Sequence, residues 1–505
     1  GKEAEDMQPT LERAGRVSLR ELIPQGRFFG TDDIQFESCC GDAHRCEPGD
    51  LFVAIEAQDR DGHDLYREAV ERGASAIIAE RPLPVSIPVC VVPDTRQAYG
   101  HICQLLAGRP ADKMHVIGVT GTNGKTTTSM LIASILEAAA SRVGVISTLG
   151  RSDSAQTKPA ARTTPVPPEM ASWLKRMSTN GCSHAVLEVS SHALAQHYTA
   201  GLQFDAAVLT NLRRDHVDLH GSVMNYRKTK ARLFEQLKTN GFCVINADDP
   251  GSQAILPKLT APVITVGQRE QAEITATVIE RHASEQTFLL MAGNETVPVR
   301  TQMIGDHHVS NCLAAAAVGL VMGIDLATVA RGLEAVACVP GRMERVECGQ
   351  RFGVFVDSAD NPDRLAIALK ALRKVTSGRV ICVFGTPEHR PHGDRPMMGR
   401  VVERAADLGV LTGGHIPQAE PLRALHDVLD GYDRAARAHL IPTRRQAIEW
   451  ALEQAKPGDS VLIAGEGRLG VVSERCQLTT LDDYDIARGW LYESARAELT
   501  YSCFN

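Results

Sequence analysis

Residues 116–129, "VIGVTGTNGKTTTS", constrain the fold more than any other stretch of this 505-residue chain. The apolar run from Met114 to Val119 predicts a buried strand, and the glycines that follow it predict a tight loop. The next residues, "TTTSMLIASILEAA", have the pattern of a helix. A strand, a glycine loop, a Lys-Thr pair and a helix N-terminus together predict a phosphate-binding loop.

Within this loop, backbone N–H groups are expected to hold phosphates, Lys125 to neutralise their charge and Thr126 to reach Mg²⁺. The spacing departs from the usual pattern, because five residues separate Gly118 from Gly124 and Val119 occupies the first-glycine position. A strand-to-helix turn that binds nothing is the alternative. The apolar run before the loop and the helical run after it favour phosphate binding.

Composition narrows the classes of function. The net charge of −7 implies no general affinity for nucleic acid or acidic membranes. Apolar runs of about 18 residues are absent from the sequence, so no transmembrane span is predicted. The N-terminal "GKEAEDMQPT" lacks the apolar core of a secretory signal. The 13 cysteines, odd in number and scattered, indicate a reducing compartment, and we expect a cytoplasmic protein.

Three regions follow one another along the chain, with breaks at "AGRPADK" and "CVPGRMERVECG". We predict domains at 1–112, 113–338 and 339–505. Apolar runs such as "HAVLEVS" and "RVICVFG" alternate with helical stretches, which predicts an α/β fold with a parallel sheet covered on both faces. Residues 272–300 alternate in polarity instead and predict a small antiparallel insertion. In such folds ligands bind at the carboxyl ends of the strands.

Seven motifs occur in a fixed order along the chain. They are "GVTGTNGKTTT", "RTTP", "LEVSSHAL", "TNLRRDHVDLHG", "YRKTKARLF", "NADD" and "GRMERV". In these motifs the chain resembles the Mur ligase family, over nearly its whole length and most closely from 114 to 250. The resemblance implies a three-domain architecture, in which a central parallel-sheet phosphate-loop ATPase domain lies between a UDP-sugar-binding N-terminal domain and an amino-acid-binding C-terminal domain.

The resemblance also implies a reaction. It points to the family members that add the third amino acid, with meso-diaminopimelate as one candidate, to UDP-N-acetylmuramoyl-L-alanyl-D-glutamate in peptidoglycan precursor synthesis. The γ-phosphate of ATP is transferred to a substrate carboxylate, and an incoming amine displaces phosphate from the acyl phosphate to form an amide. The implied cofactors are ATP and Mg²⁺, the implied substrates are the UDP-N-acetylmuramoyl dipeptide and an amino acid, and the expected state is a monomer.

Three residues outside the loop are implied at the metal and the reaction centre. The resemblance places Glu188 and His216 near Mg²⁺, and it implies that Lys230 is carbamylated and so becomes a carboxylate-like metal ligand. The candidate catalytic residues are thus Lys125, Lys230 and His216. Independently, Glu188 ends an apolar run, where its oxygens are the ligands that Mg²⁺ prefers. The alternatives are a solvated loop glutamate, a zinc pair of His216 and His220, and a surface lysine on a helix.

The resemblance extends to the two substrates. The residues implied at ATP are Gly121, Thr122, Asn123, Gly124, Lys125, Thr126, Thr127, Asn311, Arg342 and Asp357. The residues implied at the nucleotide-sugar peptide and the amino acid are Thr163, Thr164, Ser190, Gln196 and Arg390. Thr164 precedes a proline and Ser190 follows a strand-like run, so helix capping is the alternative role for both. Asp357 ends the run "GVFVD", where a carboxylate can hold ribose hydroxyls.

Several positions depart from the family pattern. Ala43 replaces the serine of a uridine-binding Asp-Ser-Arg, Tyr198 replaces an arginine, and "GDHHVSN" places two histidines where the family has Phe-Asn beside adenine. Gly414 and Pro417 replace the ends of an Asp-Asn-Pro-Arg motif that selects diaminopimelate, and Leu469 replaces a later glutamate. A ligase with a different third amino acid is one interpretation, and a non-catalytic scaffold is another. A ligase of the folate-polyglutamate type is disfavoured by "RTTP" and "EVSSHAL".

Overall fold

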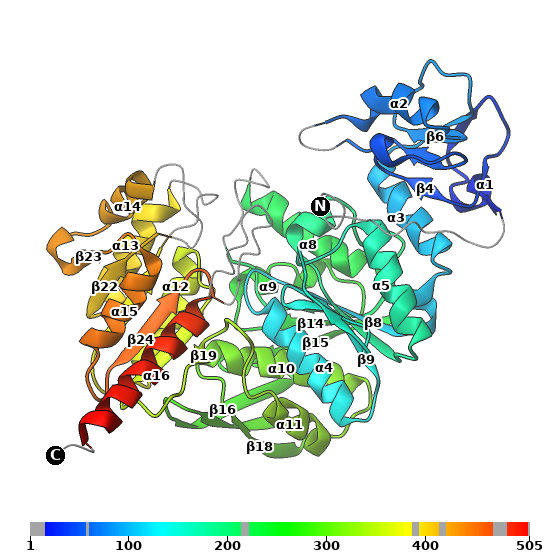
Figure 1. Ribbon diagram of the computed structural model, residues 1–505. Coiled ribbons are helices and arrows are strands. Elements are labelled where there is room, and N and C mark those ends of the chain that lie inside the picture. Colours follow the sequence, from blue (N-terminus) through cyan, green and yellow to red (C-terminus); the bar gives the residue numbers. More distant parts are fainter. Residues whose placement is uncertain are drawn as a thin grey trace. The chain divides into compact units, whose positions relative to one another are not determined.

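A computed structural model describes residues 16–56, 60–213, 222–385, 393–413, 421–467 and 482–502 (Figure 1). Two compact units make up the chain: residues 1–266 with 317–323, and residues 267–316 with 324–505. Strands and helices alternate in both units, which confirms the predicted α/β class. The proposed domain boundaries after residues 112 and 338 stay predictions.

The first part of the first unit is a five-stranded sheet with the order β2-β7-β6-β5-β4. Its strands are β2 Arg27–Phe29, β4 Cys39–Cys40, β5 Leu51–Val53, β6 Ala76–Ala79 and β7 Val89–Val91. All neighbours pair in parallel except β2, which is antiparallel to β7. The other elements are β1 Val17–Ser18, α1 Leu19–Leu22, β3 Gln35–Phe36, α2 Tyr66–Glu71 and α3 Thr95–Leu106, with 3₁₀ turns at Ala43–Arg45, Gly62–Leu65 and Pro110–Lys113.

A second sheet of the first unit runs in the order β11-β10-β9-β12-β8-β13-β14-β15. Its strands are β8 His115–Thr120, β9 Val143–Ser147, β10 Gly150–Ser152, β11 Thr157–Lys158, β12 His184–Glu188, β13 Phe204–Leu209, β14 Leu237–Asn246 and β15 Val263–Gly267. The six strands from β9 to β15 in this order are parallel, and β10 and β11 extend the edge as a hairpin. Parallel pairing brings the carboxyl ends of β8, β12 and β13 to one edge.

Helices of the first unit cover this sheet. They are α4 Lys125–Ala138, α5 Pro167–Thr179, α6 Ser191–Ala195, α8 Val223–Glu235 and α9 Pro250–Gln253, with a 3₁₀ turn at Leu256–Lys258. α5 and α8 share one buried core with the sheet, to which Trp173, Leu174, Tyr226 and Leu233 contribute. α4 packs against β8, β9 and β12. The two elements that flank the loop, β8 and α4, are therefore both packed within the first unit.

The second unit contains the predicted antiparallel insertion and a further α/β sheet. The insertion is β16 Ile274–Arg281, β17 Gln286–Ala292 and β18 Glu295–Thr301, which confirms the prediction for residues 272–300. The sheet has the order β19-β20-β24-β21-β22-β23, and only β19 is antiparallel. Its strands are β19 Glu344–Arg345, β20 Gly353–Asp357, β21 Val380–Phe384, β22 Leu408–Leu411, β23 Ala438–Leu440 and β24 Ser460–Ala464. The helices are α10 Asp306–Val321, which begins in this unit, α11 Leu326–Ala335, α12 Pro362–Arg373, α13 Asp394–Ala405, α14 Pro421–Leu429, α15 Arg444–Gln454 and α16 Asp483–Ser502.

A buried ion pair ties the last helix to this sheet. The Arg444 guanidinium donates to both carboxylate oxygens of Asp483 at 2.7 Å, and it also donates to the carbonyl oxygen of Ala464 at 2.9 Å. The two charged side chains are 2% and 0% exposed. Arg444 begins α15, Ala464 ends β24 and Asp483 begins α16, so one guanidinium joins three elements.

None of the helices in the described ranges combines the length and apolar character that a membrane crossing requires.

Candidate active site

The loop between β8 and α4 has the backbone that a phosphate cradle needs. Gly121 has φ +150° and Gly124 has φ +84°, conformations that side chains with a Cβ rarely adopt. A Cβ on Gly121 would lie 1.9 Å from Oγ1 of Thr210, so this position also requires a glycine for space. Gly124 directly precedes the first turn of α4, where backbone N–H groups have no helical partner and can bind an anion.

Residues that follow β13 hold this loop from the side. The amide of Asn211 accepts from the Asn123 N–H at 3.0 Å and donates to the Asn123 carbonyl oxygen at 3.0 Å. Thr210 Oγ1 donates to the same carbonyl at 2.6 Å, and the Asn211 carbonyl accepts from the Thr122 N–H at 2.9 Å. Thr210 and Asn211 were not among the predicted site residues. Their position at the start of "TNLRRDHVDLHG", at the end of a parallel strand, was the available signal.

Lys125 is the first residue of α4 and folds back over the loop. Its Nζ donates to the carbonyl oxygens of Gly121 at 3.0 Å and Thr122 at 3.1 Å. These are the carbonyls of the cradle itself, so the ammonium lies at the position where a bound phosphate would need a counter-charge. The predicted role of Lys125 is consistent with this position.

Thr126 and Glu188 meet at the ends of α4 and β12. Thr126 Oγ1 lies 3.1 Å from each carboxylate oxygen of Glu188, which is 2% exposed. Thr148 fixes one of these oxygens by its N–H at 2.9 Å and its hydroxyl at 3.1 Å. The interpretation of Glu188 as a solvated loop residue is therefore wrong. The pair presents hydroxyl and carboxylate oxygens beside a phosphate loop, and that donor set suits Mg²⁺.

Lys230 lies buried against the same loop. Only 1% of this residue is exposed, and its Nζ donates to the Gly121 carbonyl at 2.9 Å and to Thr120 Oγ1 at 3.3 Å. Its ammonium is 5.0 Å from the ring centroid of Tyr226, whose hydroxyl bonds with Thr122 Oγ1 at 3.0 Å. The interpretation of Lys230 as a surface lysine is wrong. A buried ammonium reaching a phosphate loop from a second helix is a functional candidate in its own right.

The predicted substrate residues of the first unit adjoin Glu188. Thr164 is buried, and its hydroxyl donates to the Glu188 carbonyl at 2.8 Å and accepts from the Ser190 N–H at 3.0 Å. Ser190 caps α6 by accepting from the Ala193 N–H at 3.1 Å. Thr163 Oγ1 lies 3.1 Å from Thr148 Oγ1, and a half-buried Gln196 follows α6. The capping role predicted as an alternative for Ser190 is present. The same alternative is wrong for Thr164, because the N-cap of α5 is Val166 and the Thr164 hydroxyl bonds to the backbone of Glu188 and Ser190.

The predicted ATP residues Asn311, Arg342 and Asp357 belong to the second unit. Asn311 lies on α10 and is 5% exposed. Arg342 donates to the Gly341 carbonyl at 3.1 Å and to the hydroxyl of Ser358. Asp357 ends β20 and accepts from the Met343 N–H at 2.7 Å. Burial raises the pKa of Asp357, although the nearby Arg342 opposes this shift.

Two departures from the family pattern lie at the start of α10. His307 and His308 stack with ring centroids 4.2 Å apart at an angle of 38°. His308 is 2% exposed, and neither ring nitrogen has a hydrogen-bond partner in the described part of the chain. Burial holds the pKa of His308 well below its usual value, and the electrostatic effects of the neighbouring His307 and Arg342 act in the same direction. The folded protein therefore keeps this imidazole neutral.

We expect His308 to make the protein less stable in mild acid. Below about pH 6.5 an unfolded chain binds a proton at this imidazole, whereas the buried ring stays neutral to a lower pH. The unfolded state then holds more protons, so the free energy of unfolding falls as pH falls, by up to about 1.4 kcal/mol per pH unit. Denaturant midpoints measured between about pH 7 and 5 should decline more steeply for the parent than for His308→Asn. Equal slopes in the two proteins would contradict this role.

Two further departures from the family pattern, Ala43 and Tyr198, lie in the described part of the chain, and several other predicted positions do not. Ala43 lies in a 3₁₀ turn, and the neighbouring His44 pairs with Glu68 at 2.5 Å. Tyr198 stacks edge-on with His192 at 5.8 Å between ring centroids. The predicted positions outside the described residues are His216, His220, Arg390, Gly414, Pro417 and Leu469.

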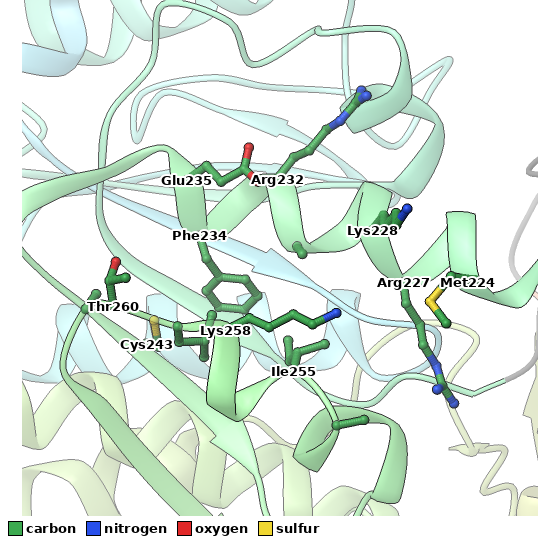
Figure 2. A pocket seen from close by; sticks show the side chains of 14 residues that line it. Met224, Arg227, Lys228, Arg232, Phe234, Glu235, Cys243, Ile255, Lys258 and Thr260 are labelled. Carbon is green, nitrogen blue, oxygen red and sulfur yellow. The ribbon is translucent and has the colours of Figure 1, made fainter.

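A cavity of about 530 Å³ lies on another side of α8 (Figure 2). Arg227 and Lys228 project from the helix, and the side chain of Lys258 extends past Ile255. Phe234 lines its apolar wall. Lys230 does not line this cavity although it belongs to the same helix. One face of α8 thus contacts the phosphate loop through Lys230, and another face lines this cavity, called the cationic cavity for its Arg227, Lys228 and Lys258.

The fold and the site together define a class. A glycine loop with a Lys-Thr pair, a carboxylate at the end of the adjacent parallel strand and a buried lysine from a second helix describe a phosphate-loop nucleotide-binding protein. Two family models match the chain: "Mur ligase middle domain" at residues 119–319, and "Mur ligase, glutamate ligase domain" at residues 341–467.

Curated relatives cover almost the whole chain. A UDP-N-acetylmuramoyl-L-alanyl-D-glutamate--2,6-diaminopimelate ligase of Geobacillus thermodenitrificans is 39% identical over 459 residues, which is 90% of this chain and 94% of the relative. The enzyme of the same name from Chlorobium phaeobacteroides is 36% identical over 95% of this chain and 98% of its own length. The chain belongs to the Mur ligase family, and it is an ATP-dependent ligase that forms amide bonds. The predicted resemblance is confirmed.

Solved structures agree with this assignment. A structure titled as UDP-N-acetylmuramoyl-L-alanyl-D-glutamate--2,6-diaminopimelate ligase superposes with a TM-score of 0.69 and 28% identity, covering 95% of this chain and 99% of that chain. A MurF ligase from Thermotoga maritima in complex with ADP gives a TM-score of 0.61 at 21% identity, covering 90% of this chain and 98% of that one. At 21% identity, the likeness to the MurF ligase shows only that the two chains share a fold.

Proposed function

We propose that the protein joins an amino acid to UDP-N-acetylmuramoyl-L-alanyl-D-glutamate, with ATP and Mg²⁺, in peptidoglycan precursor synthesis. The curated relatives carry this substrate in their names and match over about nine-tenths of the chain. The observation that carries the proposal is the convergence of Lys125, Lys230 and the Thr126–Glu188 pair on one phosphate loop. A scaffold without catalysis would have no need of a buried lysine at that loop.

The proposed reaction has two steps. An oxygen of the substrate carboxylate attacks the γ-phosphorus of ATP, the bond to the β,γ-bridging oxygen breaks, and ADP leaves. The amine of the incoming amino acid then attacks the acyl carbon, inorganic phosphate leaves, and the amine loses a proton as the amide forms. Both steps bring anions together, so the site must supply positive charge where the phosphoryl group moves.

This chain's residues have distinct parts in that scheme. The backbone N–H groups at the start of α4 bind the phosphates, and Lys125 neutralises the charge that develops on the transferring group. Thr126 and Glu188 fit Mg²⁺, because both offer oxygen and Glu188 is held in place by Thr148. The metal, when bound, neutralises phosphate charge. We further propose that Lys230 acts as a carbamate, whose oxygens would extend the same donor set.

The experiment that tests this function is phosphate release that depends on the amino acid. The full chain is incubated with ATP, Mg²⁺ and the dipeptide nucleotide, and phosphate is measured with and without each amino acid. We expect release only when an amino acid and the dipeptide nucleotide are both present. ATP hydrolysis that is indifferent to both would contradict the ligase proposal.

Selectivity for the amino acid is a separate prediction. We expect weaker preference for meso-diaminopimelate than in relatives with Asp-Asn-Pro-Arg, because Gly414, Pro417 and Leu469 supply no charge for its distal ammonium and carboxylate. A missing charged hydrogen bond costs about 1.5–3 kcal/mol, or roughly 10- to 150-fold in affinity. The measurement is kcat/KM for meso-diaminopimelate, lysine and a neutral amino acid of similar length. A preference for diaminopimelate above about a thousandfold would contradict the prediction.

A further inference from the structure

Two thiols and a carboxylate lie close together beside the five-stranded sheet of the first unit, in a segment that precedes the phosphate loop in the sequence. Cys40, Cys46 and Asp50 place their Sγ and carboxylate oxygen atoms within 4.8 Å of one another. The three residues are 9%, 4% and 5% exposed. None of them was predicted as a site residue, and the proposed reaction makes no use of them.

Local structure brings the three residues together. Cys40 ends β4, and the chain then turns through Ala43–Arg45, where the Cys46 N–H bonds to the Ala43 carbonyl. A second turn follows, in which the Asp50 N–H donates to the Glu47 carbonyl at 3.1 Å, before β5 begins. The cluster is thus formed by a single segment whose two ends are strands of one sheet.

Hydrogen bonds hold two of the three groups in place. Cys40 Sγ lies 2.9 Å from the Asp42 carbonyl oxygen. Asp50 is oriented by donors of its own, because its oxygens accept from the Ser38 hydroxyl and from the Glu47 N–H at 2.9 Å.

We propose that Cys40, Cys46 and Asp50 bind one thiophilic divalent cation, Zn²⁺ being the physiological candidate. Ligands about 2.3 Å from a tetrahedral ion are roughly 3.8 Å apart, so the observed cluster needs to contract by no more than about 1 Å. Two thiolates select Zn²⁺ over Mg²⁺ or Ca²⁺, which prefer oxygen. In a reducing compartment such a thiol pair is a metal site more often than a disulfide.

The neighbouring residue supplies a matched control. Cys39 and Cys40 are consecutive residues of β4, so their side chains point to opposite faces of the sheet. Cys39 packs with the core that contains Cys103, whereas Cys40 packs with Cys46. Cys39→Ser therefore removes an adjacent thiol without touching the proposed ligands.

The test uses the full chain, reduced and then freed of reductant and metal. Zn²⁺ alone is added and measured by native mass spectrometry, and Co²⁺ alone is added as a spectroscopic probe. We expect one Zn²⁺ per chain. The spectrum of the Co²⁺ complex should contain thiolate-to-metal charge-transfer absorption with the intensity expected for two thiolate ligands. Cys40→Ser and Cys46→Ser should each weaken binding by more than about 100-fold, since even outer-shell partners of zinc ligands cost 10- to 100-fold when changed. Asp50→Asn should weaken it less, and Cys39→Ser should not change it.

Several results would overturn the proposal. They are absence of Zn²⁺ binding by the parent, a cobalt spectrum without thiolate absorption, or undiminished binding by both serine variants. A Cys40–Cys46 disulfide that forms in preference to the metal complex, seen as a loss of two hydrogens from the mass, would also overturn it. Should the serine variants fail to fold, the stoichiometry and the cobalt spectrum of the parent still decide the outcome. Both readouts are independent of ligase activity.

Discussion

Lys125→Ala is expected to lower ATP-dependent ligation by at least about 1000-fold, the size of effect seen when a charge that stabilises phosphoryl transfer is removed. The reason is positional, because Nζ of Lys125 lies over the carbonyls of Gly121 and Thr122 that form the cradle. The same bonds are local, so the variant should unfold at nearly the parent temperature. Ligation is followed by amide product, and unfolding by circular dichroism.

Lys175→Ala is the matched control for that experiment. Lys175 is an exposed residue of α5, and its loss should leave both activity and stability unchanged. Parent-level ligation by Lys125→Ala would show that the loop does not bind the transferring phosphate. A large drop in unfolding temperature would instead assign Lys125 a structural role.

Lys230→Ala is expected to lose ligation to a similar degree and to regain part of it in acetate. The carboxylate of acetate can occupy the space left by the side chain and replace the oxygens of the proposed carbamate. Lys230 is 1% exposed, so its removal also leaves a buried gap beside Gly121 and Thr120. Some loss of stability is therefore expected, unlike the result for Lys125→Ala. Activity is measured across an acetate series with chloride as the matched anion.

The same helix provides the control for Lys230. Lys228 faces the cationic cavity instead of the phosphate loop, so Lys228→Ala should keep parent activity. A carbon-13 resonance from labelled bicarbonate, present in the parent and absent in Lys230→Ala, would identify the carbamate directly. A folded Lys230→Ala protein with full activity would exclude any special role for this lysine. Lost activity without rescue would favour an ammonium over a carbamate.

Local sequence carried the information for the loop but not for what surrounds it. Gly121, Gly124 and Lys125 lie within five consecutive residues. The strand before them and the helix after them follow from the apolar pattern alone, so the cradle could be predicted. Asn211 reaches the loop from β13 and depends on strand order, which no local pattern encodes. Local pattern alone left Lys230 as one of four basic residues on its helix, and the family resemblance singled it out; packing shows that it is buried.

The same limit explains the remaining misses. The burial of His308 without a hydrogen-bond partner depends on how α10 packs within its unit, and a sequence of two adjacent histidines does not disclose it. Cys40 and Cys46 were counted among scattered cysteines because five residues separate them, and the 3₁₀ turn at Ala43–Arg45 is needed to bring them together. Both features depend on which residues meet in the folded protein, and a single sequence does not supply that information.

The buried guanidinium of Arg444 limits where the C-terminal region can be shortened. A chain cut before Asp483 would keep this cation inside the sheet region without its counter-charge, a change that typically costs about 3–5 kcal/mol. That is a large part of the roughly 5–15 kcal/mol that stabilises an ordinary domain. Premature stop codons before Asp483 should therefore produce substrates for cellular proteases. Tags and fusions belong beyond α16, and a minimal C-terminal fragment must retain Asp483.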